Sequence, residues 1–244
     1  MTKIIINGSK GNMGQAAVKA VQSDPSLNLI ATLDKDDCLK TILKNKSVDV
    51  TIDLTHPSCV FENVQTILKN KSHAVVGTTG LSQEQLTLCD NLAKEQKKSV
   101  IVCPNFAIGA ILMMRFATQA AKFFDRCEII EYHHDKKADA PSGTAIKTAE
   151  LISKSVPEIN SIPLKEDELI KGARGANKNN IPIHSIRIPG VVANQDIIFG
   201  ALGQSMTIKH ETISRDAFMP GLILAVKAAS EKKGLIYGLE HLLD

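Results

Sequence analysis

The stretch of residues 3–22 constrains the fold of this 244-residue chain more than any other stretch. Residues 3–7 (KIIIN) form a β-branched run, a loop with Gly8, Gly11 and Gly14 follows, and residues 15–22 carry alanine and valine at helical spacing. A continuous β-branched run indicates a strand buried on both faces of a parallel sheet. Strand, glycine loop and helix in this order are typical of a dinucleotide-binding domain, in which the helix N-terminus holds a pyrophosphate.

The loop has the spacing G-x-x-G-x-x-G and not the commoner G-x-G-x-x-G, so a plain strand-to-helix turn stays open as an alternative. The next predicted strand, residues 29–33, ends at Asp34, about twenty residues after Gly14, where a ribose-binding carboxylate is expected. Asp34 favours the free 2′-hydroxyl of NAD, whereas Lys35 can pair with the 2′-phosphate of NADP. The pair predicts a site for both NADH and NADPH, unless these charges merely end a strand.

Predicted strands and helices alternate as far as residue 106. Strands are expected at 48–54, 73–76 and 100–102, a helix at 60–69, and a further helix begins at the capping-box pattern of residues 82–85. This alternation predicts an α/β fold with a Rossmann-like, doubly wound parallel sheet, whose ligands lie beyond the carboxyl ends of the strands. Three polar segments lie at such ends: Thr55, residues 77–80 (GTTG) and residues 104–106 (PNF).

The pattern changes after the apolar residues 107–124, which include Arg115 and Lys122 and so predict a core helix instead of a membrane span. Strands at 128–132, 181–188, 196–201 and 205–211, with one helix at 145–153, predict a smaller α+β domain with a mixed or antiparallel sheet. Residues 171–180 are expected to form a mobile loop, and a last helix at 217–232 leads back to the first domain. We therefore expect a dinucleotide-binding domain of residues 1–106 and 217–244, and a substrate-binding and oligomerisation domain of residues 107–216.

Residues 131–145 (EYHHDKKADAPSGTA) contain several groups that can take part in catalysis: proton donors, positive charges and backbone N–H donors. A histidine with an ordinary pKa of about 6.5 can donate a proton at neutral pH, and a neighbouring lysine supplies positive charge or a second proton. Gly143 and Thr144 at a helix start offer backbone donors to a carboxylate. Adjacent histidines on one strand point to opposite faces, so His133 and His134 are a poor metal pair and we expect no metal.

Composition excludes several other functions. The net charge of +3 and lysine groups without interleaved aromatic residues argue against nucleic acid as a partner. The five cysteines are scattered and include no C-x-x-C, which argues against a disulfide framework and for a reducing, cytoplasmic location. Neither a signal segment nor a membrane partner is expected, because the apolar start of the chain has the form of a strand.

The pattern E-x-H-H-x-x-K-x-D-A-P-S-G-T at residues 131–144 resembles the signature of the 4-hydroxy-tetrahydrodipicolinate (dihydrodipicolinate) reductase family. The similarity covers nearly the whole chain, including the glycine loop and the segments 53–55, 77–80, 104–106, 183–187 and 214–215. It implies an NADH- or NADPH-dependent oxidoreductase of lysine and diaminopimelate biosynthesis, which reduces a cyclic, unsaturated dicarboxylate. It also implies a homotetramer, assembled through the second domain's sheet, whose second domain closes over the cofactor.

The same resemblance implies roles for individual residues. His133 is the proton donor and Lys137 its partner, while His134, Gly143 and Thr144 bind a substrate carboxylate. If both histidines face the substrate, the strand must end or bend at His133. The expected cofactor-binding residues are Gly8, Ser9, Lys10, Gly11, Asn12, Met13, Asp34, Lys35, Gly77, Thr78, Thr79, Cys103, Pro104, Asn105 and Phe106.

Two segments depart from the family pattern. The interval between Asp34 and Val48 is short, so an element present in longer members is expected to be missing. The family's R-G-G-D…G-E-H reads here as residues 187–190 (RIPG) and 193–195 (ANQ), which affects loop geometry and oligomer contacts more than chemistry. Two other functions are alternatives to this one: a non-catalytic dinucleotide-binding sensor, and a dehydrogenase of another substrate such as homoserine or a sugar. Neither class has a reason to keep the histidine–lysine–turn segment.

Overall fold

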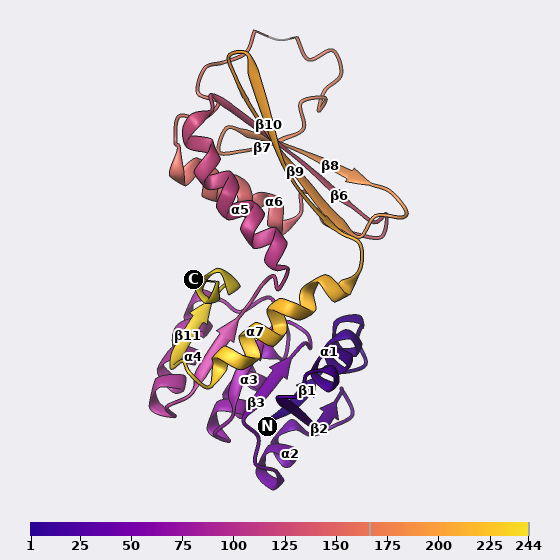
Figure 1. Ribbon diagram of the computed structural model, residues 1–244, viewed down its shortest axis with the longest axis vertical. Coiled ribbons are helices and arrows are strands. Elements are labelled where there is room, and N and C mark those ends of the chain that lie inside the picture. The colour runs from indigo at the N-terminus through magenta and orange to yellow at the C-terminus, as the bar shows by residue number, and fades with distance from the viewer. Residues whose placement is uncertain (166, 244) are drawn as a thin grey trace. The chain divides into compact units, whose positions relative to one another are not determined.

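The computed structural model describes residues 1–165 and 167–243, which form two compact units. The first unit combines Met1–Ile108 with the residues from Arg215 onward, and the second is Gly109–Ser214. The first contains a six-stranded parallel sheet and the second a five-stranded mixed sheet (Figure 1). The predicted α/β class, with a Rossmann-like sheet and a smaller domain built on a mixed sheet, is confirmed.

The sheet of the first unit has the order β11-β5-β4-β3-β1-β2, and all its pairings are parallel. The chain moves from β1 outward to β2 and then returns to place β3 on the other side of β1. The carboxyl ends of β1 and β3 therefore form the switch point at which such sheets bind ligands. The strands are β1 (Thr2–Asn7), β2 (Leu27–Leu33), β3 (Val50–Asp53), β4 (His73–Val76), β5 (Ser99–Val102) and β11 (Gly234–Tyr237).

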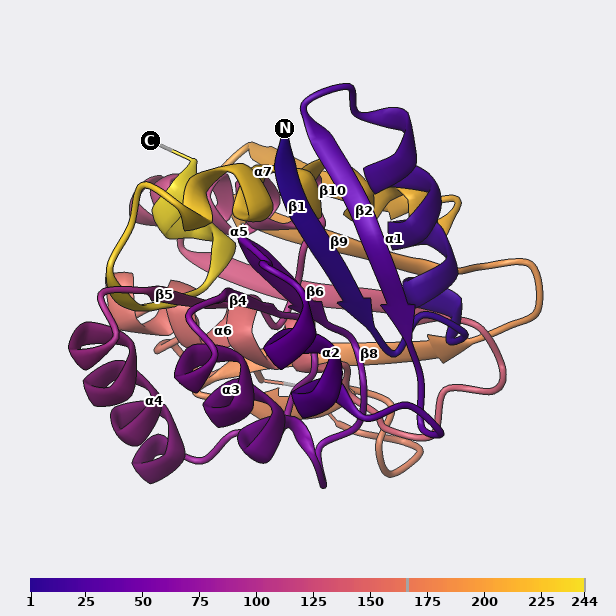
Figure 2. The ribbon, with the colours of Figure 1, turned by 90° about the horizontal axis from the view of Figure 1, so that it is seen from below.

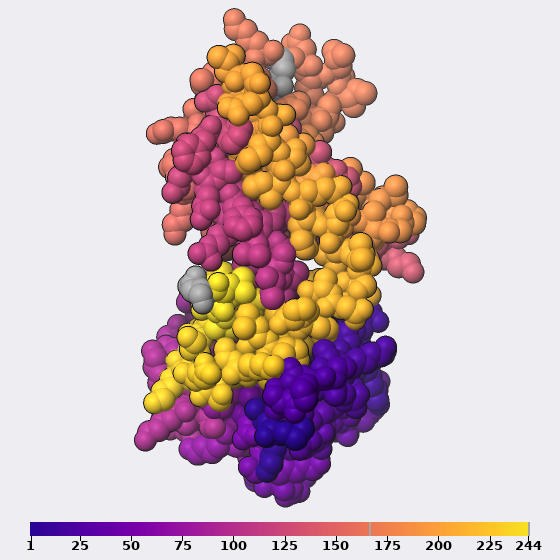
Figure 3. Space-filling view, in the orientation of Figure 1, coloured from indigo at the N-terminus to yellow at the C-terminus, as the bar shows by residue number. Residues whose placement is uncertain are grey.

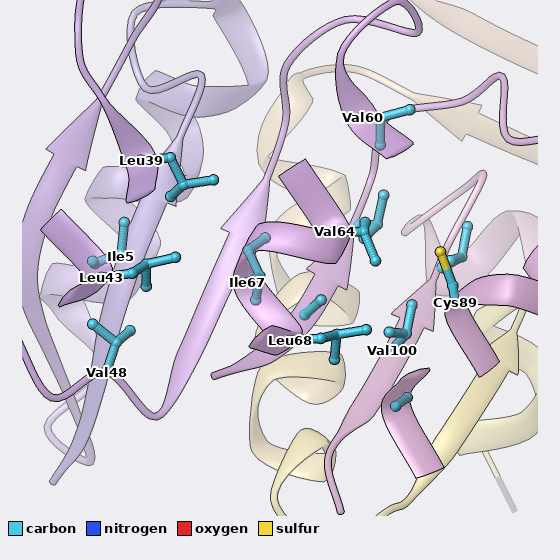
Figure 4. Packing of buried hydrophobic residues seen from close by; sticks show 14 of the residues in the cluster. Ile5, Leu39, Leu43, Val48, Val60, Val64, Ile67, Leu68, Cys89 and Val100 are labelled. Atoms are coloured by element: carbon cyan, nitrogen blue, oxygen red, sulfur yellow. The ribbon is translucent and has the colours of Figure 1, made fainter. Parts of the chain in front are cut away.

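Helices cover both faces of this sheet, as its continuous apolar strands require. On one face α2 (Leu39–Asn45), α3 (Val60–Lys69) and α4 (Gln83–Glu95) pack against the sheet (Figures 2 and 4). On the other face lie α1 (Asn12–Ser23) and α7 (Met219–Ala229), which contact each other. The C-terminal segment, in yellow, accordingly lies against the N-terminal segment in indigo (Figure 3). The chain thus returns to the first unit after the second.

Local sequence explains where these helices begin. Ser82 accepts a hydrogen bond from the Gln85 backbone, and the Gln85 side chain accepts one from the Ser82 backbone, so the predicted capping box is formed. The interval after Asp34 does contain an element, helix α2, with Leu39 and Leu43 in the core. These two leucines, four residues apart, anchor the short helix to the sheet. That an element of longer family members is missing from this interval stays a prediction.

The sheet of the second unit has the order β10-β9-β6-β8-β7, with β6 and β8 parallel and the other pairs antiparallel. One face carries an apolar core shared with α5 and α6. The elements are α5 (Ile108–Ala120), β6 (Arg126–His133), α6 (Gly143–Ser155), β7 (Ala176–Lys178), β8 (Ile181–Arg187), β9 (Ala193–Ala201) and β10 (Gln204–Thr212). Three short 3-10 helices, Ala121–Phe123, Arg215–Phe218 and Leu239–Leu242, complete the elements of the described chain.

One segment of this unit differs from the prediction. Residues 171–180 were expected to be a loop throughout, but residues 176–178 form the edge strand β7, paired antiparallel with the start of β8. Asn179 and Asn180 connect the two strands with positive φ angles of 52° and 65°. Consecutive asparagines at positive φ are typical of a two-residue hairpin turn, so the pair Asn179-Asn180 is the sequence signal for this hairpin.

Candidate active site

The glycine loop between β1 and α1 leaves no room for side chains at two of its positions. Gly8 has φ +86°, and a Cβ there would lie 2.4 Å from the Leu54 carbonyl oxygen. A Cβ on Gly14 would lie 2.1 Å from the Gly8 carbonyl oxygen. Helix α1 begins at Asn12, so Gly14 lies in its first turn, and no side chain caps this helix N-terminus. The backbone at this uncapped helix N-terminus is therefore not covered by side chains. Such backbone can approach a dinucleotide pyrophosphate closely.

Asp34 follows β2 and lies against this loop. Its carboxylate accepts hydrogen bonds from the Lys10 and Lys35 backbone N–H groups, each at 2.9 Å. These two bonds, the one from Lys35 first, hold the pKa of the carboxyl below its usual value. The structure thus brings the predicted ribose-binding carboxylate and the predicted phosphate loop together, with Lys35 as the next residue.

A cavity of about 440 Å³ opens at the carboxyl ends of β3, β4 and β5. Eight of the predicted cofactor residues line it, and so does Thr55: Met13, Gly77, Thr78, Thr79, Cys103, Pro104, Asn105 and Phe106. Leu54, Pro57, Arg215 and Phe218 complete the lining. The last two lie far along the chain, in the turn before α7, and no local pattern assigns them to this edge. The cavity and the glycine loop share Met13, so they form one continuous edge for a cofactor.

Asp53, at the end of β3, accepts hydrogen bonds from four side chains beside the cavity. It is fully buried, and Thr55 and Thr78 donate their hydroxyl groups to its Oδ1 at 2.7 and 2.9 Å. Asn7 and Asn63 donate to Oδ2 at 3.1 and 2.9 Å. Because the Thr78 hydroxyl donates to Asp53, that side chain supports the cavity wall. Burial raises the pKa of the Cys103 thiol to about 12, so that residue contributes shape and not reactivity.

The second unit contains the predicted acid. Strand β6 ends at His133, as expected for two adjacent histidines that serve one site. The His133 ring places Nδ1 2.5 Å from Oε2 of Glu131, a fully buried carboxylate on the same strand. Burial lowers the pKa of His133 from its usual value, and Glu131 acts against that shift. The imidazole is thus held at Nδ1, while Nε2 has no hydrogen bond to a described residue.

The other predicted residues of this unit lie on the loop and helix that follow. Lys137 is mostly buried and forms an ion pair with Asp139, at 2.7 Å. The backbone N–H of Lys137 donates to the His134 carbonyl, so the chain turns back at this point. Helix α6 then begins at Gly143, with Ser142 as its cap. A Cβ on Gly143 would meet nothing within 4 Å, so the space at this helix N-terminus is open to an anion.

Two residues of this cluster were not predicted to have a role. Glu131 and Arg187 form a bidentate ion pair, with nitrogen–oxygen distances of 2.9 and 2.8 Å. Glu131 was detectable, because residues two apart on a strand share a face and Glu131 precedes His133 by two. Arg187 becomes a neighbour only through the pairing of β6 with β8, where His133 lies opposite Arg187.

The described residues include no group of three His, Cys, Asp or Glu side chains arranged to hold a metal ion. Among those residues, none of the helices has the length and apolar character needed to cross a membrane. A glycine loop, a strand-end cavity and an acid–lysine cluster define a class of protein, an oxidoreductase that binds a dinucleotide.

Comparison with known proteins narrows this class. Family models described as "Dihydrodipicolinate reductase, N-terminus" and "Dihydrodipicolinate reductase, C-terminus" match residues 2–106 and 109–243. A 4-hydroxy-tetrahydrodipicolinate reductase of Streptococcus pneumoniae (serotype 19F, strain G54) is 45% identical over 252 residues, covering 99% of both chains. The dipicolinate-bound dihydrodipicolinate reductase of Paenisporosarcina sp. TG-14 is 42% identical, with a TM-score of 0.92 and full coverage of both chains. GenD2 from gentamicin A biosynthesis shares only the fold, at 12% identity and a TM-score of 0.64, with 99% of this chain and 90% of that one covered.

The chain therefore belongs to the dihydrodipicolinate reductase family. It is an oxidoreductase with 4-hydroxy-tetrahydrodipicolinate reductase activity, which serves lysine biosynthesis, and the family uses NAD(P)H. The family resemblance stated from residues 131–144 is confirmed over the full length of the chain.

Proposed function

We propose that His133 is the acid of this reductase and that Lys137 assists it, while the N-terminus of α6 binds a substrate carboxylate. The observation that supports this most is the position of His133 at the end of β6, held at Nδ1 with Nε2 unbonded among described residues. An imidazolium at that position can release the Nε2 proton to the substrate and regain a proton from solvent. Lys137 adds a fixed positive charge for a dicarboxylate. His134, Gly143 and Thr144 complete the carboxylate site in this proposal.

The protonation state of His133 sets a pH dependence. Burial lowers its pKa, so in the free enzyme the imidazolium fraction falls as pH rises through a value below the ordinary one. A dianionic substrate beside the ring raises that pKa again, because an opposite charge favours the protonated form. Turnover should therefore decline on the basic side of its pH profile, and binding should be tighter in mild acid.

In the same proposal the first unit is the dinucleotide-binding domain. The residues that hold the cofactor are the fifteen predicted from the sequence, Gly8–Met13, Asp34–Lys35, Gly77–Thr79 and Cys103–Phe106. When bound, NADH or NADPH supplies the hydride. The glycine loop positions the pyrophosphate, Asp34 accepts the ribose hydroxyl of NADH, and Lys35 pairs with the 2′-phosphate of NADPH. Thr78 and Cys103 shape the cavity.

The second unit binds the substrate and carries the oligomer contacts. The substrate is a planar or nearly planar ring dicarboxylate, a class consistent with the dipicolinate in the Paenisporosarcina enzyme. Helices α5 and α6 cover one face of the five-stranded sheet, and the opposite face has the partly exposed Ile130, Ile186 and Ile198. A sheet face of this kind favours burial against other copies, which supports the proposed homotetramer. Five free cysteines support a cytoplasmic location.

The experiment measures His133→Gln and Lys137→Ala. The controls are His184→Gln and Lys136→Ala, in which another histidine and another lysine of the same unit are changed. We expect the first two to lower kcat by about 10²-fold or more, the low end of the effect of a general acid. NADPH affinity should stay unchanged in all four, because the proposed cofactor residues belong to the other unit. Turnover by His133→Gln within twofold of wild type would contradict the proposed acid. Loss of NADPH binding would contradict the division of roles.

A further inference from the structure

Glu131 contacts the proposed acid, His133, at Nδ1, the ring nitrogen that does not donate the transferred proton. Its Oε2 lies 2.5 Å from His133 Nδ1, and its side chain has 0% exposure. A carboxylate accepts hydrogen bonds only, so Nδ1 must carry a hydrogen in both protonation states of the ring. The neutral ring then has its lone pair on Nε2. The transferred proton consequently enters and leaves at Nε2 alone.

Arg187 keeps that carboxylate charged and fixed. Its Nη1 donates to Oε2 at 2.9 Å and its Nη2 to Oε1 at 2.8 Å, the bidentate geometry that a guanidinium forms with a carboxylate. Burial alone would raise the pKa of Glu131, but hydrogen bonds from Arg187, Ser185 and His133 outweigh it, and the pKa lies below the usual value. Glu131 is therefore an ionised group that can orient an imidazole.

The same pair anchors the two other parts of the proposed site. Arg187 Nη2 also donates to the Asp139 carbonyl oxygen at 2.7 Å, and the Asp139 carboxylate holds Lys137 at 2.7 and 2.8 Å. The Ser142 backbone N–H, at the start of α6, donates to Glu131 Oε1 at 3.2 Å. The acid, the lysine loop and the helix N-terminus thus all connect to one carboxylate.

We propose that Glu131 and Arg187 are positioning residues for the reduction: Glu131 fixes the proton-donating tautomer and direction of His133, and Arg187 joins Glu131 to the loop of Lys137. This inference rests on the proposed function, since it assumes that His133 is the acid. Three charged groups surround the ring: Glu131 on its own strand, Arg187 on β8 and Lys137 in the loop. The residue opposite on β9 is Ala193, which carries no charge. Of these groups, Glu131 alone favours the imidazolium.

A second carboxylate on β6 provides a matched control. Glu128 contacts His184 and Arg174, the same residue types, but three residues earlier and on the other face of the strand. Its side chain is 33% exposed, whereas that of Glu131 is 0% exposed. Glu128→Gln therefore changes the same chemistry on the same strand without contact with His133.

The test measures kcat against pH for wild type, Glu131→Gln, Glu128→Gln and His133→Gln, each checked by circular dichroism. We expect Glu131→Gln to lower kcat at neutral pH by about tenfold or more and to move the basic limb to lower pH. Glu128→Gln should keep the wild-type limb. A Glu131→Gln profile with an unmoved limb would overturn the inference, since a purely structural residue would lower the whole curve. If His133→Gln stays active, the proposed acid itself fails, which separates that failure from this one.

A measurement on the wild-type enzyme covers the case in which Glu131→Gln does not fold. Nitrogen-15 NMR of labelled histidine, assigned by the signals missing in His133→Gln, reports which ring nitrogen carries hydrogen in the neutral form. We expect hydrogen on Nδ1 and a lone pair on Nε2. The opposite tautomer would overturn the inference.

Discussion

The buried imidazole of His73 should make the free energy of unfolding depend on pH. It lies at the start of β4 with 7% exposure, and the Ser99 backbone N–H donates to its Nδ1 at 3.1 Å. Burial, with a smaller effect from Lys98, lowers the pKa of His73 from 6.5 to about 4. Protonation at Nδ1 would also break the bond from Ser99. The folded protein therefore keeps this imidazole neutral.

The sign and size follow from linkage. Between pH 6.5 and about 4 the unfolded chain binds a proton at His73 that the folded chain does not, so unfolding becomes easier as pH falls. The difference in the free energy of unfolding is absent above the pKa of the unfolded state and complete below that of the folded state, where it reaches about 3 kcal/mol. At pH 5 the same two pKa values give ~2 kcal/mol.

The perturbation is His73→Asn, which keeps an acceptor for Ser99 and removes the titration. Urea unfolding followed by circular dichroism at pH 7.5 and pH 5, at one protein concentration, gives the free energy of unfolding. We expect wild type to lose about 2 kcal/mol more than His73→Asn between the two pH values, while His56→Asn, at an exposed position of the same unit, behaves as wild type. Equal losses in wild type and His73→Asn would refute the reasoning.

Two further predictions concern the cofactor edge. Gly14→Ala places a methyl group 2.1 Å from the Gly8 carbonyl oxygen, so it should weaken NADPH binding by at least about tenfold (~1.4 kcal/mol). Gly200→Ala, whose Cβ would meet nothing within 4 Å, should leave binding unchanged in the same fluorescence titration. Lys35→Ala should weaken NADPH binding by about tenfold and spare NADH, and Asp34→Ala should do the reverse. Equal losses for both cofactors in either variant would contradict the proposed division between the carboxylate and the ammonium group.

The sequence predicted the parts of the fold that depend on local patterns. Apolar runs located the parallel strands, and the ends of α3 and β4 agree with the expected residues. Helix α2 was missed because the whole helix, Leu39–Asn45, has only seven residues, about two turns, which is too short for a clear helical period. The edge strand β7 was missed because its three residues, Ala176–Lys178, are too few to show an alternation of polar and apolar side chains.

The residues of the candidate site also fall into those that local sequence predicts and those that only the structure reveals. The His–His–Lys segment and the glycine loop are continuous in sequence, so they could be named in advance. Arg187 could be given a role only after the register of β6 with β8 was known, and Arg215 only after the turn before α7 was located. Thr78 could be named from its strand-end position, but its hydrogen bond to the buried Asp53 could be known only from the structure. Non-local pairing decides these positions, and no single stretch of sequence encodes it.

The central claim is that this chain transfers hydride from NADH or NADPH to 4-hydroxy-tetrahydrodipicolinate. The most direct measurement follows oxidation of each cofactor at its absorbance band, with substrate generated in place from pyruvate and aspartate semialdehyde by the preceding synthase. We expect rapid oxidation of both cofactors, dependent on substrate and inhibited by 2,6-pyridinedicarboxylate. Tight cofactor binding without any oxidation would contradict the central claim and would indicate a dinucleotide sensor.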